Sequence, residues 1–221
     1  MEVDARLTGV CKMPNEERFS KKDALQALYL AFERYAGTPV PDDEKAVWER
    51  IVTAQQLRRK SLLLRVGDCP VWYYFLYKGL CRQYYLDPDG NDVTRGFAIE
   101  GEFCCTECRI QSERAVFNVE TLEDCQVLAF RYEDLDVLRE SAYMKEVHIG
   151  ALEKLLRQRM YREASFTMEN ARDRYRSFCR DYPDYEARVR RVYLASYLGM
   201  TPESLSRIRG GMKEPPGKEL I

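Results

Sequence analysis

The segment that most constrains the fold is residues 56–132, where short runs of aromatic and branched residues end at glycines. Four of these runs end at Gly67, Gly79, Gly90 and Gly101, so that a turn recurs roughly every 11–12 residues. This rhythm is typical of antiparallel strands joined by tight turns in a sandwich or barrel. Asp87–Asn91 is the strongest turn, because Asp-Gly tolerates the positive φ of a tight hairpin. We therefore expect an antiparallel β-roll here.

Helical periodicity flanks the expected roll on both sides. Residues 21–36 carry apolar groups at helical spacing, and a second short helix is expected to follow, starting near residue 42. From residue 133 the period is helical again, and no proline follows until Pro183. The sequence predicts one long helix, either continuous or broken near residues 165–170.

Apolar residues follow one face of the long helix in two adjacent rows. The rows are Val147, Ala151 and Leu155, and Leu152, Leu156 and Met160. The stripe is longer than one small β-roll requires for its core. Ordinary packing accounts for part of it, and we expect the rest to face a second copy of the chain in a homodimer.

The stretch YLASYLGMTPESLSRIR, residues 193–209, has the pattern of two helices joined by a tight turn. Gly199 permits the turn, Thr201 is a suitable N-cap, and Pro202 suits the first turn of the second helix. Leu205 can pack inward against the first helix. This pattern predicts a helix-turn-helix.

Packing of the apolar residues leaves polar side chains on the outer face of the second helix. The residues expected to bind DNA are Thr201, Glu203, Ser204, Ser206, Arg207 and Arg209. Arg can donate two hydrogen bonds to guanine, Glu can accept one from cytosine, and hydroxyls can contact phosphate or base edges. The alternative is a helical hairpin whose polar face has no DNA ligand.

Charge is distributed unevenly along the chain, whose net charge is −1. Residues 1–149 contain 20 Lys/Arg and 26 Asp/Glu, whereas residues 150–221 contain 15 and 10. The C-terminal part is therefore positive, as suits a polyanionic partner, although a solvated helical surface explains much of the difference.

The composition argues against an enzyme and against a membrane protein. His148 is the only histidine, and the sequence has no GxSxG, phosphate-loop or HExxH motif. A cupin-type enzyme would need several histidine ligands. There is no apolar run of about 20 residues and no signal-peptide pattern, so we expect a cytoplasmic protein with reduced thiols.

The order of these parts resembles the Crp/Fnr family of bacterial transcription regulators. Leu64–Phe103 is similar to the family's cyclic-nucleotide-binding-type β-roll, and LASYLGMTPESLSRIR is similar to its C-terminal motif. The resemblance covers about residues 22–212. It implies a homodimer in which a sensor roll controls two recognition helices. The partners it implies are double-stranded DNA, RNA polymerase and an unidentified small-molecule effector. It also assigns base reading to Glu203 and Arg207, and a phosphate contact to Thr201.

The predicted fold class is α+β, in three parts. Residues 1–135 are expected to form N-terminal helices and an antiparallel, jelly-roll-like β-roll. Residues 136–168 are expected to form the dimerisation helix, and residues 169–221 the helix-turn-helix domain.

The candidate effector pocket is incomplete by comparison with cyclic-AMP-binding members of the family. In those members Gly-Glu opens a short helix, and Arg followed by Ser or Thr closes a phosphate cradle. Gly101 and Glu102 match the first element, but Arg114 is followed by Ala115 and the hydroxyl is missing. Because an anion pocket needs converging donors, we expect neither a cyclic nucleotide nor another cofactor.

The motif FCCTEC places Cys104, Cys105 and Cys108 within six residues. In a helix, Cys104 and Cys108 would share one face and could form a redox or metal site. Zinc and iron–sulfur sites normally use four ligands, and Cys81 or Cys125 could complete the set only if the fold brought it near. The spacing matches no metal signature, so we expect buried apolar packing and no metal.

These observations predict a DNA-binding transcription regulator of Crp/Fnr type. The alternative is a sensor or scaffold with a degenerate helix-turn-helix that does not bind DNA, which the near-neutral total charge leaves open.

Overall fold

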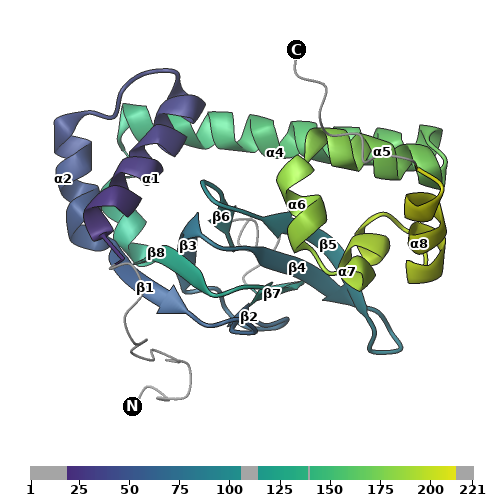
Figure 1. Cartoon of the computed structure of the whole chain (residues 1–221). Coiled ribbons are helices and arrows are strands. Elements are labelled where there is room, and N and C mark those ends of the chain that lie inside the picture. Colours follow the sequence, from purple (N-terminus) through teal and green to yellow (C-terminus); the bar gives the residue numbers. More distant parts are fainter. Residues whose placement is uncertain (1–18, 106–113, 139, 213–221) are drawn as a thin grey trace. The chain divides into compact units, whose positions relative to one another are not determined.

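The computed structural model describes residues 19–105, 114–138 and 140–212 (Figure 1). The chain forms two compact units. The first comprises Met1–Tyr85 and Gly96–Leu152, and the second comprises Leu86–Arg95 and Glu153–Ile221. The boundary therefore falls inside the long helix rather than at one of its ends.

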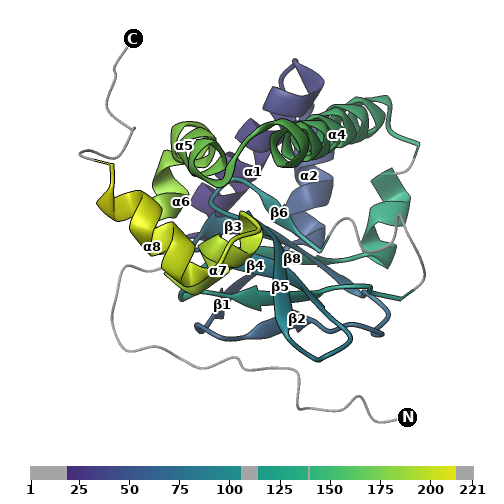
Figure 2. The same ribbon diagram turned by 90° about the vertical axis from the view of Figure 1, so that its right-hand side faces the viewer.

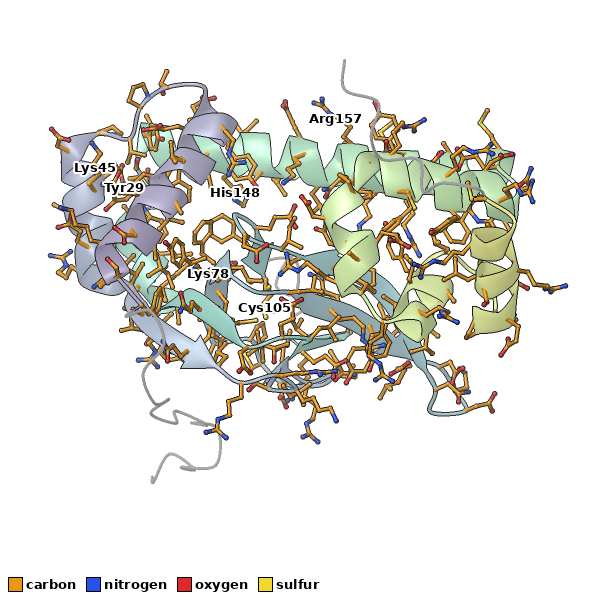
Figure 3. All side chains as sticks on the ribbon, in the orientation of Figure 1. Tyr29, Lys45, Lys78, Cys105, His148 and Arg157 are labelled. Atoms are coloured by element: carbon orange, nitrogen blue, oxygen red, sulfur yellow. The ribbon has the colours of Figure 1, made fainter. Side chains whose placement is uncertain are left out.

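The two N-terminal helices lie where the sequence predicts them. Helix α1 spans Lys21–Ala36 and ends at Gly37, whose φ of 72° lets its N–H donate to Glu33 O at 2.8 Å. Helix α2 spans Asp42–Ile51 and has three acidic residues in its first turn. The two helices are joined by the Tyr29 hydroxyl, which donates to Lys45 O at 3.2 Å (Figure 3).

The strands form two four-stranded sheets, as expected for a roll. Their bounds are Thr53–Leu57 (β1), Leu62–Leu64 (β2), Trp72–Lys78 (β3), Cys81–Leu86 (β4), Asp92–Ala98 (β5), Phe103–Cys104 (β6), Asn118–Thr121 (β7) and Cys125–Arg131 (β8). The strand orders are β1-β8-β3-β6 and β2-β7-β4-β5. The β1–β8, β3–β8, β3–β6, β2–β7 and β4–β7 ladders are antiparallel.

The first sheet is covered on both faces. Neighbouring strand residues point to opposite sides, so Phe75 and Phe130 join a core with helices α1 and α2, while Leu76 and Val127 join the interior of the roll. Figure 1 shows α1 and α2 beside strands β1 and β8. The alternating placement explains why these strands are apolar at consecutive positions.

The glycines predicted to end strands do take turn conformations. Gly67, Gly79, Gly90 and Gly101 all have positive φ, between 80° and 112°. At the Asp87–Asn91 turn, the Asp87 carboxylate accepts hydrogen bonds from the backbone N–H groups of residues 89 and 91. The tight hairpin predicted at Asp-Gly is confirmed.

The chain after the roll is helical. It comprises a 3₁₀ helix, η2 (Glu133–Leu138), followed by α4 (Ala142–Met168), α5 (Ala171–Asp181), α6 (Pro183–Arg188), α7 (Arg191–Tyr197) and α8 (Pro202–Gly210). The long helix is broken, as one of the two alternatives predicted. Asn170 caps α5 by accepting from the N–H groups of Arg172 and Asp173.

The apolar stripe on α4 divides between the core and the surface, as expected for a stripe of which only part packs in the core. Val147 is 4% exposed and belongs to the core formed with α1. Leu152, Leu156 and Met160 are 38%, 61% and 62% exposed. The second row is therefore the one that could face a partner. His148 is exposed on the same helix (Figure 3).

Candidate nucleic-acid interface

Helices α7 and α8 and the turn between them occupy the segment for which a helix-turn-helix is predicted (Figure 2). Leu194, Ala195 and Leu205 are completely buried where the two helices meet. Gly199 has a φ of 66°, and the next residue, Met200, donates its N–H to Ala195 O at 3.0 Å. The turn is thus closed by backbone hydrogen bonding, and a left-handed glycine makes that possible.

Thr201 is the N-cap of α8, as predicted. Its Oγ1 accepts from the Ser204 N–H at 3.1 Å, which satisfies one of the free N–H groups of the first turn. Pro202 occupies the first helical position. The start of the candidate recognition helix is therefore fixed by its own sequence.

The predicted DNA-binding residues differ in solvent exposure and in their hydrogen bonds. Glu203, Ser206 and Arg207 are exposed. Ser204 is half-buried, and its hydroxyl oxygen lies 3.2 Å from Thr201 Oγ1 and accepts from Arg207 Nη2 at 3.3 Å. Ser204 thus belongs to the cap, and it holds the Arg207 guanidinium along the helix.

Glu203 is the acidic residue of this exposed surface. Its own backbone N–H and the hydroxyl of Thr201 lower the pKa of the Glu203 carboxyl, and Arg207 lowers it further. The group is therefore ionised at neutral pH and can act only as a hydrogen-bond acceptor. Acceptance from an exocyclic amino group such as that of cytosine fits this state.

Arg209 is exposed on α8 and also has a partner on another helix. Its Nη2 lies 2.8 Å from Oε1 of Glu186 on α6. The same carboxylate oxygen accepts from the Tyr175 hydroxyl at 2.9 Å. The last turn of α8 is therefore tied to α5 and α6 by a shared, largely buried carboxylate.

Two arginines at the start of α7 were not predicted. Arg191 Nη1 donates to Ser206 Oγ at 3.4 Å, which places an exposed guanidinium beside the outer face of α8. Arg190 is also exposed and lies over the Tyr193 ring, with its Cζ 5.2 Å from the centroid. The sequence signal that could have identified them is the adjacent pair of arginines directly before VYLASYLG.

The candidate effector residues lie at different places in the roll. Gly101 and Glu102 form the turn before β6, where the Gly101 N–H donates to Leu76 O and Glu102 Oε2 accepts from the Ile99 N–H. Arg114 is exposed, and its Nη1 donates to Gly67 O at 2.9 Å. The segment between Glu102 and Arg114 lies largely outside the described residues.

Apolar side chains and thiols form one buried cluster in the roll, while the same strands also bury polar residues such as Arg82 and Asn118. The members of the apolar cluster are Leu64, Leu76, Cys81, Ala98, Cys104, Cys105, Ala115, Phe117, Val119, Cys125 and Val127.

The fold brings Cys81 and Cys125 to Cys104. The Cys81 thiol is hydrogen-bonded to both of the others. Cys104 lies in strand β6, so the helical i, i+4 arrangement considered for it is wrong, and Cys108 is outside the described residues. Burial raises the pKa of the Cys104 thiol. Neutral, buried thiols of this kind behave as small apolar residues.

Metal and membrane signals can be assessed only for the part of the chain that the structure describes. Within that part, no group of three or more His, Cys, Asp or Glu side chains could hold a metal ion. Within the same residues, no helix combines the length and the apolar character that crossing a membrane requires.

Known proteins share this fold. Residues 54–142 match the family model of the Cyclic nucleotide-binding domain. FixK2 from Bradyrhizobium japonicum is similar at 17% identity, over 72% of this chain and 83% of that chain, with a TM-score of 0.62. CLP, the c-di-GMP-responsive global regulator of Xanthomonas campestris, is similar at 17% identity, over 75% and 88%, with a TM-score of 0.61.

A transcriptional regulator from Eubacterium rectale described as Crp/Fnr family is similar at 16% identity, over 76% of this chain and 82% of that chain, with a TM-score of 0.61. A search of curated protein sequences found no match. The predicted combination of β-roll, long helix and C-terminal helices is confirmed, and so is the resemblance to the fold of Crp/Fnr-type proteins.

Proposed function

We propose that this chain, which has the β-roll and helical architecture of Crp/Fnr-type regulators, is a DNA-binding transcription regulator that acts in the cytoplasm as a homodimer. The observation that carries the proposal is helix α8, which is capped at Thr201 and presents Glu203, Ser206 and Arg207 to solvent. A helix of this kind fits the major groove, where such side chains can reach base edges.

The arginines around α8 support the proposal. Arg190 and Arg191 are exposed at the start of the first helix, the part of a helix-turn-helix that crosses the DNA backbone. Guanidinium groups there would contact phosphates and give affinity without sequence preference. Arg207, held along α8 by Ser204, is the residue placed to read a guanine edge.

Dimer formation is supported by helix α4. Leu152, Leu156 and Met160 recur every four residues and are substantially exposed. Such a row on a long helix is the pattern of a two-helix interface. A twofold dimer would present two α8 helices to successive major grooves.

The proposal does not include cyclic AMP as the effector. Ala115 stands where a phosphate cradle would need a hydroxyl, and it is buried in a cluster of apolar groups and thiols. An effector of another chemical class is left to be identified.

The Arg207→Ala variant tests the assignment of base reading to α8. We expect it to lose about 1–3 kcal/mol of binding free energy on the selected site and to relax base preference at one position of each half-site. Arg176→Ala on α5 is the matched control, because it removes the same charge from an exposed arginine on another helix. An Arg207→Ala protein with unchanged base preference would show that α8 does not read DNA.

The alternative is a sensor or scaffold that does not bind DNA. It predicts that binding to DNA is weak, falls steeply with salt for every sequence and shows no enriched site.

A further inference from the structure

The C-terminal end of α4 is joined to the turn of the helix-turn-helix by two arginines. Arg162 on α4 donates from Nη2 to Tyr197 O at 3.2 Å, and Arg174 on α5 donates from Nε to Leu198 O at 3.1 Å. These carbonyls are at the C-terminal end of α7, where helix carbonyls lack N–H partners and the helix dipole is negative. Two positive groups therefore cap α7 from outside.

Phe166 lies within reach of both guanidinium groups. The centroid of its ring is 4.8 Å from Arg162 Cζ and 5.1 Å from Arg174 Cζ. Arg162 Cζ is also 4.9 Å from the Tyr197 ring centroid. At these distances the ring quadrupoles attract the cations, so each arginine is held by a ring as well as by a carbonyl.

The Phe166 ring also packs against the turn between α7 and α8. A Cβ added to Gly199 would lie 2.6 Å from Phe166 Cε1, which is closer than atoms can approach. Thr201, the cap of α8, follows two residues later. The Phe166 ring of α4 therefore lies against the turn that leads into α8.

Arg174 also connects the corner between α4 and α5. Its Nη1 donates to Glu169 O at 2.7 Å, one residue after α4 ends. The Glu169 carboxylate in turn accepts from the Ser177 hydroxyl at 2.7 Å. One arginine therefore bonds to the end of α4 and to the end of α7 together.

We propose that Arg162, Phe166 and Arg174 form a clamp that fixes the start of α8 to the last turns of α4, so that α4 sets the position of α8. All three are positioning residues. Calling α8 a recognition helix rests on the proposed function, but the clamp is a property of the free protein. A displacement of the end of α4 would carry the start of α8 with it.

Stepwise fluorination of Phe166 tests the clamp, because fluorine weakens the quadrupole of the ring with little change in its size. We expect hydrogen-exchange protection of the amides in residues 204–208 to fall progressively along the series, by roughly two- to tenfold in total. The same series at Phe32, a buried ring that packs against Trp48 and Phe103 in the first unit, is the control and should leave these amides unchanged. Constant protection across the Phe166 series would overturn the proposal.

A double-mutant cycle tests the contact between Phe166 and the turn. Gly199→Ala and Phe166→Ala should each reduce protection of residues 204–208, and the double variant should lose less than the sum of the two losses, because removing the ring relieves the steric conflict at position 199 while the strain of positive φ remains. Gly210→Ala, where a Cβ meets nothing within 4 Å, should leave it unchanged. Simple additivity of the two changes would contradict the contact.

These experiments use the free protein, so they separate the two proposals. Loss of protection along the fluorination series in a protein that selects no DNA would support the clamp and reject the proposed function. A protein that selects DNA but shows constant protection would reject the clamp alone.

Discussion

Thr201 caps α8 and is also the residue proposed to contact a DNA phosphate. Its hydroxyl accepts from the Ser204 N–H at 3.1 Å, and the residue is exposed at the start of α8. This capping role was predictable, because cap chemistry depends on neighbours in sequence. The tie between Arg209 and Glu186 was not, because the carboxylate comes from a different helix and only packing brings it to α8.

At the scale of a single residue, we predict that Thr201 stabilises the free protein by capping α8. Thr201→Ala should lower the free energy of unfolding by about 1 kcal/mol, whereas Thr201→Ser keeps the acceptor and should be nearly neutral. Urea unfolding followed by circular dichroism measures both. Equal losses in the two variants would show that the hydroxyl is not the cap.

The Ala variant should also weaken binding to all DNA sequences similarly, since a phosphate contact carries no base information.

Helix α4 shows what a sequence pattern can and cannot give at the scale of an element. Its position and the break before Asn170 follow from periodicity and cap residues. The surroundings of the two apolar rows on α4 could not be predicted in this way, because α1 covers Val147 but leaves Leu156 exposed. The strand at Cys104 was missed for the same reason, since its pairing partner, β3, is distant in sequence.

Gly150 lies where α4 packs tightly against the backbone of α1. A Cβ there would lie 2.3 Å from Tyr35 O, a backbone atom that cannot move aside alone. Gly150→Ala should therefore destabilise the protein by about 1–3 kcal/mol, although alanine is the better helix former. Gly210→Ala, in open space at the end of α8, should be neutral or slightly stabilising. Thermal unfolding measures the stability of both variants. A Gly150→Ala protein more stable than the original would show that α4 and α1 do not pack closely at this position.

The whole molecule consists of two units that share one helix. Residues of α4 up to Leu152 belong to the first unit, and those from Glu153 belong to the second. The order of roll, long helix and C-terminal helices could be predicted because each part has its own local pattern. The division within α4 could not, because it depends on which tertiary contacts each turn makes.

At this scale we expect the exposed row on α4 to hold two chains together. Leu156→Glu should shift the protein from dimer to monomer, because a charge would be buried without a partner. Gln158→Glu adds the same charge two positions away, on the opposite side of the helix, and should leave the dimer intact. Analytical ultracentrifugation distinguishes the two outcomes. A dimeric Leu156→Glu protein would place the interface elsewhere.

Selection of bound sequences from a random pool of double-stranded DNA, with the purified full chain, tests the central proposal most directly. We predict an enriched near-palindrome whose half-sites are centred about 10 base pairs apart, since two α8 helices in a twofold dimer would lie about 34 Å apart. A single unpaired half-site, or the absence of any enriched sequence, would contradict a dimeric DNA-binding regulator.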